Sequence, residues 1–400
     1  MQVESAVRLD TMLRPSLPFS ARFILGIALG GATCIALAQT KTPPDATWIE
    51  PSDSKLQYWG RVGLDDPKEA CFYYSSTGVR AKFHGRSLAL RFEEDNYGPA
   101  NSFGVRIDGG VEIPLVLTPG LDGTYIVAAG LPDRVHSLEI YRRQDTYGGV
   151  AKFKGMWIDK GAKLENPPRL PSRKIEFFGD SVMSGAASIA FGFEQKSDPT
   201  ISYANKDDFI NDGYWSFGAI AARLLNADAN VQGIGGLPLR DNTGWFGGPL
   251  ENCIGLETTW DKLDPIPGQF KEWDFQRFVP DVVVIAVGQN DARGGDIHDP
   301  EKRTQWKSAY TKVIEGLRSH YPKAHFVLTT TVLMHDMEWD KAIQEVADEY
   351  NPKSKDKIVR YYRFTRAGKA TPGHPRIQEE EEMGQELAKF IDRIPGVWRH

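Results

Sequence analysis

The sequence predicts an α/β protein in which a β-sandwich of the jelly-roll type precedes a three-layer α/β/α domain built on a parallel sheet. Three observations lead to this prediction. Short alternating apolar runs fill residues 58–158, a proline-containing linker occupies 161–172, and apolar runs alternate with helix-period segments from residue 173 onward. Because a chain of this length exceeds what one hydrophobic core usually serves, two domains are expected.

The beginning of the chain has the features of a secretory signal peptide. Arg14 and Arg22 precede an apolar stretch at 23–37, and Ala36-Leu37-Ala38 forms an A-x-A cleavage pattern. The apolar stretch is too short to cross a bilayer comfortably. We therefore expect residues 1–38 to be removed and the protein to be secreted or periplasmic. Cleavage is favoured over lipid anchoring because Cys34 lacks a good lipoprotein box before it.

The β-sandwich is predicted over residues 39–160. Apolar and polar residues alternate over 79–83 and again over 88–92, with a glycine-containing turn between them, and the pattern recurs at 103–107 and 113–117. No helix-period segment interrupts these runs. Many short strands with glycine turns are typical of a sandwich, and most simply of a jelly roll.

After the linker at 161–172, residues 173–400 show the alternation typical of an α/β domain. The expected strands lie at 174–178, 281–287 and 325–331, and the expected helices at 214–225, 302–320, 338–350 and 376–392. Right-handed crossovers place the loops that follow parallel strands at one edge of the sheet. Residues far apart in the sequence can therefore meet at that edge.

Polar motifs follow two of these strands directly. Gly179-Asp180-Ser181 follows the first strand, and Gly288-Gln289-Asn290-Asp291 follows the second. Open α/β sheets keep their chemistry at the carboxyl ends of their strands. We expect Ser181 on a tight turn that opens a helix, with its hydroxyl at the same edge as Asn290.

Two further segments complete a set of candidate catalytic groups. Val231-Gln232-Gly233-Ile234-Gly235-Gly236 follows the first expected helix, and either Gly235 or Gly236 fits the pattern. Thr371-Pro372-Gly373-His374-Pro375 supplies a histidine just before the last expected helix.

These groups suit nucleophilic attack on an ester. A serine hydroxyl attacks only if a base takes its proton, and His374 can do this for Ser181 because imidazole titrates near neutral pH. An oxyanion hole would consist of the Ser181 amide, the Gly235 or Gly236 amide and the Asn290 side chain. Taken singly, a glycine is more often a turn and an asparagine a cap. Asp180 and Asp291 are more simply structural partners of their loops.

The four blocks, in this order, resemble those of the SGNH (GDSL-like) hydrolase superfamily. A β-sandwich followed by such a domain resembles carbohydrate esterase family 2, whose members remove acetyl groups from plant polysaccharides, and this resemblance covers nearly the whole mature chain. It implies a secreted carbohydrate O-acetylesterase that acts on a polymer such as xylan or glucomannan.

The chain departs from the superfamily pattern at the catalytic acid. Most members carry an aspartate two or three residues before the histidine, where this chain has Pro372 and Thr371. We therefore predict a Ser-His dyad in which a backbone carbonyl orients the imidazole. The alternative is an acid from another loop, with Asp336 as the possible third member, and His335 is a runner-up base.

Substrate contacts are expected in the loops that follow the glycine block and the third strand. Aromatic faces hold the apolar faces of sugars, and polar side chains fix their orientation. The candidates are Arg240, Asn242, Trp245, Trp260 and Trp339. The other histidines have no matching ligand set, so neither a metal nor a cofactor is expected.

Composition excludes several classes of partner. The net charge of −5 and the pI of about 6.0 give no basic stripe for nucleic acid, and no cationic amphipathic helix suggests a membrane surface. No obligate protein partner is evident. Cys71 and Cys253 are too few for a disulfide framework, and we expect two buried thiols.

Two alternatives remain for the function. The first is a glycan-binding protein on an esterase fold that has decayed after loss of the acid. The second is a lipase or thioesterase of the same superfamily, which the lack of an apolar lid segment for long acyl chains disfavours. The presence of Ser181, Asn290 and His374 together favours the esterase.

Overall fold

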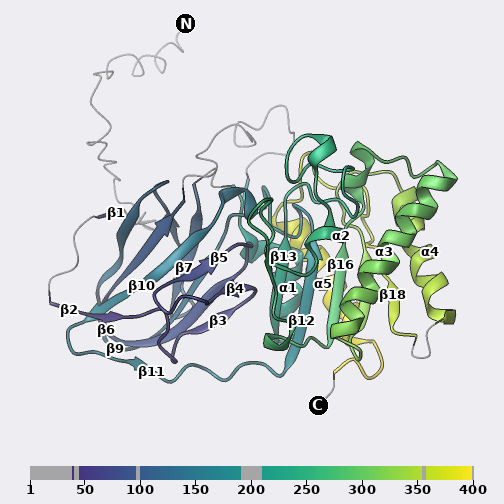
Figure 1. Ribbon diagram of the computed structural model, residues 1–400. Helices are drawn as coiled ribbons and strands as arrows, with labels where there is room; N and C mark the ends of the chain where they lie inside the picture. Colours follow the sequence, from purple (N-terminus) through teal and green to yellow (C-terminus); the bar gives the residue numbers. More distant parts are fainter. Residues whose placement is uncertain (1–37, 40–44, 96–99, 191–209, 354–356, 399–400) are drawn as a thin grey trace, which may run out of the picture. The chain divides into compact units, whose positions relative to one another are not determined.

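The structure is a computed structural model that describes residues 38–39, 45–95, 100–190, 210–353 and 357–398. The predicted signal peptide lies outside the described residues except for Ala38. Residues Ile35–His400 form one compact unit that contains an antiparallel sheet and a parallel sheet (Figure 1). No helix in the described part of the chain is long and apolar enough to span a membrane.

The first sheet is antiparallel and strongly curled. Its long strands β6 and β9 each change register at bulges, for example between Gly85 and Ser87, so one strand can follow the curve and border the core over most of its length. The central order is β4-β5-β10-β6-β9-β7-β8. The strands are β1 (Ala38–Gln39), β2 (Ala46–Ile49), β3 (Gln57–Trp59), β4 (Val62–Gly63), β5 (Ala70–Phe72), β6 (Gly78–Glu94), β7 (Ser102–Ile107), β8 (Ile113–Val116), β9 (Asp122–Arg142), β10 (Ala151–Asp159) and β11 (Leu164–Glu165).

The alternation seen in the sequence builds the core of this sheet. Val79, Ala81 and Phe83 are buried on β6, and Leu90 and Phe92 continue the same buried cluster. Aromatic rings fill its centre, with Phe92 against Phe103 at 4.5 Å between ring centroids. The N-terminal sheet predicted from this pattern is confirmed.

The second sheet is parallel, in the order β13-β12-β16-β17-β18. Its strands are β12 (Arg173–Gly179), β13 (Ala227–Gly233), β16 (Val282–Ala286), β17 (His325–Thr329) and β18 (Val359–Tyr361). Three of them match the expected strands. The sequence did not predict β13 and β18, because the residues of β13, Ala-Asp-Ala-Asn-Val-Gln-Gly, do not form an apolar run.

Helices cover this parallel sheet, and four of the five described helices begin close to where the sequence placed them, while the short helix at Leu256–Thr259 was not predicted. The helices are α1 (Phe217–Leu224), α2 (Leu256–Thr259), α3 (Pro300–His320), α4 (Glu338–Tyr350) and α5 (Ile377–Asp392). Helix α3 starts earlier than expected because Asp299 caps it and Pro300 occupies its first turn. Short 3-10 turns lie at η1 (Thr146–Gly148), η2 (Gly213–Trp215), η3 (Leu250–Asn252), η4 (Phe275–Arg277), η5 (Gln289–Arg293) and η6 (Asn351–Lys353), and a small hairpin joins β14 (Lys262–Asp264) to β15 (Lys271–Glu272).

Side chains of the central strand β16 alternate between two buried clusters. Val282, Val284 and Ala286 pack with residues of α1 and α5. Val283 and Ile285 pack with residues of α3 and α4. The near-continuous apolar run in the sequence therefore has partners on both of its faces, as is typical of a central parallel strand.

A fully buried ion pair joins the two sheets. Arg61, just before β4, contacts Glu176 on β12 with 3.0 Å between Nη2 and Oε1, and both side chains are 0% exposed. The Nη1 atom of Arg61 donates to the carbonyls of Trp260 at 2.9 Å and Lys262 at 2.7 Å. The guanidinium also lies 5.2 Å from the centroid of the Phe178 ring. The strand that leads to Ser181 is thus tied to the first sheet.

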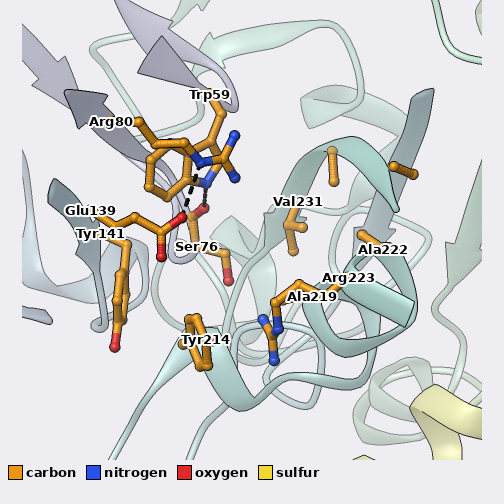
Figure 2. Close-up of a pocket in the computed structure, with 12 residues that line it drawn as sticks. Trp59, Ser76, Arg80, Glu139, Tyr141, Tyr214, Ala219, Ala222, Arg223 and Val231 are labelled. Carbon is orange, nitrogen blue, oxygen red and sulfur yellow. Dashed lines mark hydrogen bonds and ion pairs between the residues drawn. The ribbon is translucent and has the colours of Figure 1, made fainter. Parts of the chain in front are cut away.

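A cavity of about 140 Å³ lies elsewhere between the first sheet and the β13 edge of the second (Figure 2). Arg80 bonds Glu139 at 3.2 Å and stacks on Trp59, while Arg223 stacks on Tyr214 at 3.8 Å. None of the residues that line the cavity is a predicted catalytic residue. Both of its arginines therefore contact aromatic rings of the same lining.

The two cysteines that the structure describes beyond the leader are free thiols. Cys253 is buried and Cys71 is half-buried, and no bridge joins them, a question that the sequence left open. The expectation that both are buried holds for Cys253 alone.

We predict that Arg61→Met destabilises the protein by about 3–5 kcal/mol, because it leaves the Glu176 carboxylate buried without its charge partner. The control is Arg91→Met, which breaks an exposed pair with Asp122 and should cost at most about 1 kcal/mol. Chemical denaturation of the three proteins measures both changes. A loss for Arg61→Met no larger than that of the control would show that the buried pair does not join the sheets as described.

Candidate functional site

Ser181 lies where the sequence placed it, two residues after the end of β12. The amide of Ser184 donates to the Asp180 carbonyl at 3.0 Å, and the amide of Ala186 donates to the Ser181 carbonyl at 2.9 Å. The expected helix does not form here, and turns follow instead. The reason lies at Gly185, whose φ is +76° and whose absent Cβ would lie 2.3 Å from the Asp212 carbonyl.

His374 meets Ser181 across a long separation in sequence. Its Nε2 atom lies 2.7 Å from the Ser181 Oγ atom. The loop that carries His374 is held by a bond from the Arg376 guanidinium to the His374 carbonyl at 2.7 Å, and the amide of Ile377, at the start of α5, donates to Ser188 at 2.9 Å. The histidine loop is thereby fastened to the loop of the serine.

The environment of His374 favours the neutral imidazole. Burial, followed by the charge of Arg376, lowers the pKa of His374 to about 4. A neutral imidazole whose Nε2 faces a hydroxyl can accept that hydroxyl's proton. The pair therefore has the geometry and the protonation state of a nucleophile with its base.

Asn290 lies in η5, directly after β16, and its side chain is directed toward the serine loop. Its Nδ2 atom donates to the Asp180 carboxylate at 3.0 Å and to the Leu237 carbonyl at 3.2 Å. These bonds bring together the serine, glycine and asparagine blocks. Because both N–H bonds of the amide have protein acceptors, an oxyanion would have to share or replace one of them.

The structure distinguishes between the two candidate glycines. Gly235 packs against the carboxylate of Asp145, which comes from the connection between β9 and β10, so that a Cβ atom on Gly235 would lie 2.6 Å from Oδ2. Gly236 adopts a φ of +67°, and its carbonyl accepts from the Trp245 amide at 2.9 Å. The Gly236 amide is therefore the better candidate for an oxyanion donor.

Two buried aspartates support the loops of the site. Asp291 accepts from the amides of Leu239 at 2.7 Å and Arg240 at 3.1 Å, and burial raises its pKa to about 6. Asp180 accepts from the Val182 amide at 3.0 Å and from the Gln289 side chain at 2.5 Å. Burial outweighs these bonds and raises the pKa of Asp180 to about 7. Both residues accept bonds that join their own loop to a neighbouring loop of the site.

The alternative acid and the alternative base have partners of their own. Asp336 lies 2.7 Å from His298 Nε2 and accepts from the Glu338 amide at 2.9 Å. His335 bonds Asp340 and the Leu333 carbonyl. Burial by itself would lower the pKa of His335, but the hydrogen bond and charge of Asp340 outweigh it and raise that pKa.

Of the expected substrate contacts, Trp245 is the best placed. Its indole is 55% exposed beside the Gly236 loop, and the Arg293 guanidinium lies 4.0 Å from the ring centroid. Arg240 is half-buried and donates to Gln305 at 3.3 Å. Asn242 has a φ of +62°, and its backbone amide donates to the Cys253 carbonyl at 2.9 Å.

Two of the predicted contacts require correction. Trp339 is 2% exposed and packs against Trp306 at 5.4 Å between centroids. Trp260 packs against Phe275 and against His320, the last residue of α3. Because β17 begins shortly after His320, Trp260 lies at the edge of the sheet where the strands begin, opposite the edge that carries Ser181. Neither indole is exposed beside the Gly236 loop as Trp245 is, although Trp260 is only half-buried and Trp339 lines a cavity of about 150 Å³ together with Arg240.

Two residues that support the site, Gln289 and Asp145, were not predicted from the sequence. Gln289 bridges Asp180 and the Thr331 hydroxyl, which donates to its Oε1 atom at 2.9 Å. Its position beside Asn290 in the motif could have suggested this role. Asp145 belongs to the other sheet, and no pattern of spacing connects it with Gly235. Among the described residues, no group of three or more potential ligands could hold a metal ion.

The fold and the site together define an ester hydrolase of the SGNH type. A family described as carbohydrate esterase 2 N-terminal matches residues 58–168, and a family described as GDSL-like lipase/acylhydrolase matches residues 177–358. The two matches together show a chain that is similar to the SGNH (GDSL-like) hydrolases and most like carbohydrate esterase family 2.

Similar proteins agree with this assignment. The cellulase/esterase CelE of Acetivibrio thermocellus is 29% identical over 343 residues, which cover 84% of this chain and 39% of that protein. An acetylxylan esterase/glucomannan deacetylase of Cellvibrio japonicus is 23% identical over 352 residues, which cover 86% of this chain and 90% of that protein. The chain thus spans well under half the length of the first of these relatives.

Solved structures share the fold over most of the chain. A family two carbohydrate esterase from Clostridium thermocellum, in complex with cellohexaose, has a TM-score of 0.72 at 28% identity and covers 86% of this chain and 99% of its own. The corresponding Cellvibrio japonicus structure has a TM-score of 0.75 at 23% identity and covers 87% of this chain and 98% of its own.

We predict that kcat/KM on a small acetyl ester stays level as the pH falls from 8 to about 5, because His374 is active when neutral and its pKa is lowered to about 4. Activity should then fall as the pH passes through that value. A pH profile of kcat/KM on the free enzyme measures this. An acidic limb near pH 7 would contradict it and would indicate a carboxylate that raises the pKa of His374.

Asp336→Asn serves as the matched variant in that experiment. Because the Asp336 carboxylate bonds His298, the variant should keep both the profile and the rate of the wild type. A loss near the 10⁴-fold scale of a triad aspartate would assign Asp336 as the acid.

Proposed function

We propose that the protein is a secreted carbohydrate O-acetylesterase that removes acetyl groups from a plant-type polysaccharide or oligosaccharide with a Ser-His mechanism. One observation carries the proposal: the Ser181 hydroxyl lies 2.7 Å from His374 Nε2 at the carboxyl edge of the parallel sheet. The expected signal peptide supports secretion. The two buried clusters on β16 support a three-layer domain, and the curled first sheet supports a jelly roll.

The first half of the reaction is acyl transfer to the enzyme. His374 takes the Ser181 proton while Oγ attacks the acetyl carbonyl, and a tetrahedral intermediate forms. His374 then returns the proton to the departing sugar oxygen, and the acetyl group stays on Ser181. In the second half, His374 deprotonates a water that attacks the acetyl carbonyl, and acetate leaves with Ser181 restored.

The negative charge of each intermediate needs donors that are already in place. We assign this role to the amides of Ser181 and Gly236 and to the side chain of Asn290, and loss of one such donor typically costs about 10² to 10³ in rate. Asn290 bonds Asp180 and Leu237 in the free protein. Transfer of one of those hydrogen bonds to the oxyanion would strengthen binding of the intermediate relative to the substrate.

A Ser-His dyad is the simplest form of this mechanism. Pro372 and Thr371 occupy the positions where most of the superfamily has its acid, and the Asp336 carboxylate bonds His298. The lowered pKa of His374 is in keeping with an imidazole in a buried surrounding beside Arg376. Burial here keeps the base neutral, and a backbone acceptor would suffice to hold its tautomer.

The substrate class follows from the relatives and from the exposed indole. Relatives are named for acetylxylan and glucomannan, and one structure is in complex with cellohexaose. Trp245 offers an exposed aromatic face next to the Gly236 loop, which suits the apolar face of a sugar ring. The cationic Arg293 on this ring adds a hydrogen-bond donor for hydroxyl groups.

Acetate release tests the proposal. We expect the wild type to release acetate from acetylated xylan or glucomannan, and Ser181→Ala to release none because the nucleophile is absent. Ser319→Ala makes the same chemical change on the exposed face of α3 and should behave as the wild type. In the same assay, Trp245→Ala should raise KM for the polymer more than for a small acetyl ester.

The outcomes separate the alternatives. Release that persists in Ser181→Ala would overturn the serine mechanism. Retained binding of the polymer with no release by the wild type would favour the glycan-binding protein, and release of long acyl chains alone would favour a lipase or thioesterase.

A further inference from the structure

The connection between β9 and β10 of the first sheet reaches the catalytic loops. The carbonyl of Arg143 accepts from the Gly213 amide at 3.1 Å, and Gln144 accepts from the side chain of Asn211 at 2.7 Å. The Tyr147 hydroxyl donates to the Trp245 carbonyl at 3.4 Å. This connection therefore contacts the segments that follow β12 and β13.

Asp145 is the residue of this connection that lies against the glycine block. It is buried, with 7% of its surface exposed, and its Oδ1 atom caps η1 by accepting from the Tyr147 amide at 3.0 Å. Its other oxygen, Oδ2, packs against Gly235. The carboxylate thus lies between the η1 turn and the glycine block.

The serine loop reaches the same carboxylate. The hydroxyl of Ser184 donates to the Ser181 carbonyl at 2.8 Å and lies within hydrogen-bonding reach of Asp145. Asp145 therefore lies between the serine turn and the glycine turn.

Gly235 packs closely against Asp145 and Tyr147. A Cβ atom on Gly235 would lie 2.6 Å from the Asp145 Oδ2 atom and 2.8 Å from the Tyr147 ring. Gly235 has an ordinary φ, so its need to be glycine comes from the first sheet's connection and not from its own backbone. The adjacent Gly236 amide, the candidate oxyanion donor, takes its direction from this fixed neighbour.

Arg142 anchors the connection between β9 and β10 to the first sheet. The fully buried Arg142 donates from Nη2 to the carbonyls of Asp145 at 2.7 Å and Gly149 at 2.8 Å, and from Nη1 to the Phe72 carbonyl at 2.7 Å. The position of Asp145 is therefore set by the core of the first sheet.

We propose that Asp145 is a positioning residue for the oxyanion hole, through which the N-terminal domain orients the Gly236 amide toward the acyl carbonyl bound at Ser181. This inference rests on the proposed esterase function. It gives the N-terminal domain a part in the chemical step in addition to any part in binding the polymer.

The experiment compares Asp145→Asn with Asp159→Asn. Asp159 lies at the end of β10 and accepts from the Arg86 amide and the Ser87 hydroxyl, so it makes similar bonds within the first sheet alone. Two readouts are measured: kcat and KM on a small acetyl ester, and the rate at which a fluorophosphonate labels Ser181. In that labelling, Oγ bonds to phosphorus, fluoride leaves and His374 takes the proton, so no acetyl substrate is needed.

We expect Asp145→Asn to lower kcat by about 10-fold, less than the 10² to 10³ of a lost donor, and to leave KM unchanged. Labelling should slow by a similar factor, because the phosphonyl oxygen occupies the same hole. Asp159→Asn should retain both rates even if its melting temperature falls as far as that of Asp145→Asn.

Rates for Asp145→Asn within twofold of the wild type, or losses equal to those of Asp159→Asn, would overturn the inference. The two proposals fail in different ways. If the wild type labels at Ser181 but releases no acetate, the esterase proposal fails while the labelling comparison still decides the role of Asp145.

Discussion

Glu176 is a carboxylate buried on the strand that leads to the nucleophile, and its burial is tolerable because Arg61 reaches it from the other sheet. Arg61 in turn needs the carbonyls of Trp260 and Lys262 and the ring of Phe178. Neither side chain is satisfied unless both sheets are in place. The consequence is that the two sheets and the chemistry at the end of β12 are organised together.

The topology of the parallel sheet brings the groups of the site together. Parallel strands deliver Ser181 and Asn290 to one edge, and the start of α5 brings His374 to the same edge. The first sheet adds Asp145 behind the glycine turn. Polar contacts between loops, more than any one strand, therefore determine the spacing of the groups that act on the ester.

The sequence predicted the parts of this arrangement that are local. Ser181 and Asn290 follow apolar strands, and His374 precedes an amphipathic helix, so periodicity and order were enough to find them. Strand β13 was missed because its polar residues hide it, and Asp145 because its contact with Gly235 is purely tertiary. The burial of Trp260 and Trp339 could not be predicted, because burial of an indole depends on the residues that pack over it. The roles of the site residues remain proposals.

The most direct test of the account is to trap the acyl-enzyme. Rapid acid quenching during turnover of an acetylated sugar, followed by peptide mass spectrometry, would reveal whether an acetyl group is attached to Ser181. The account predicts an acetylated Ser181 that forms and decays at rates consistent with kcat. Turnover of the same substrate with no acetyl group on Ser181 at any time would contradict it.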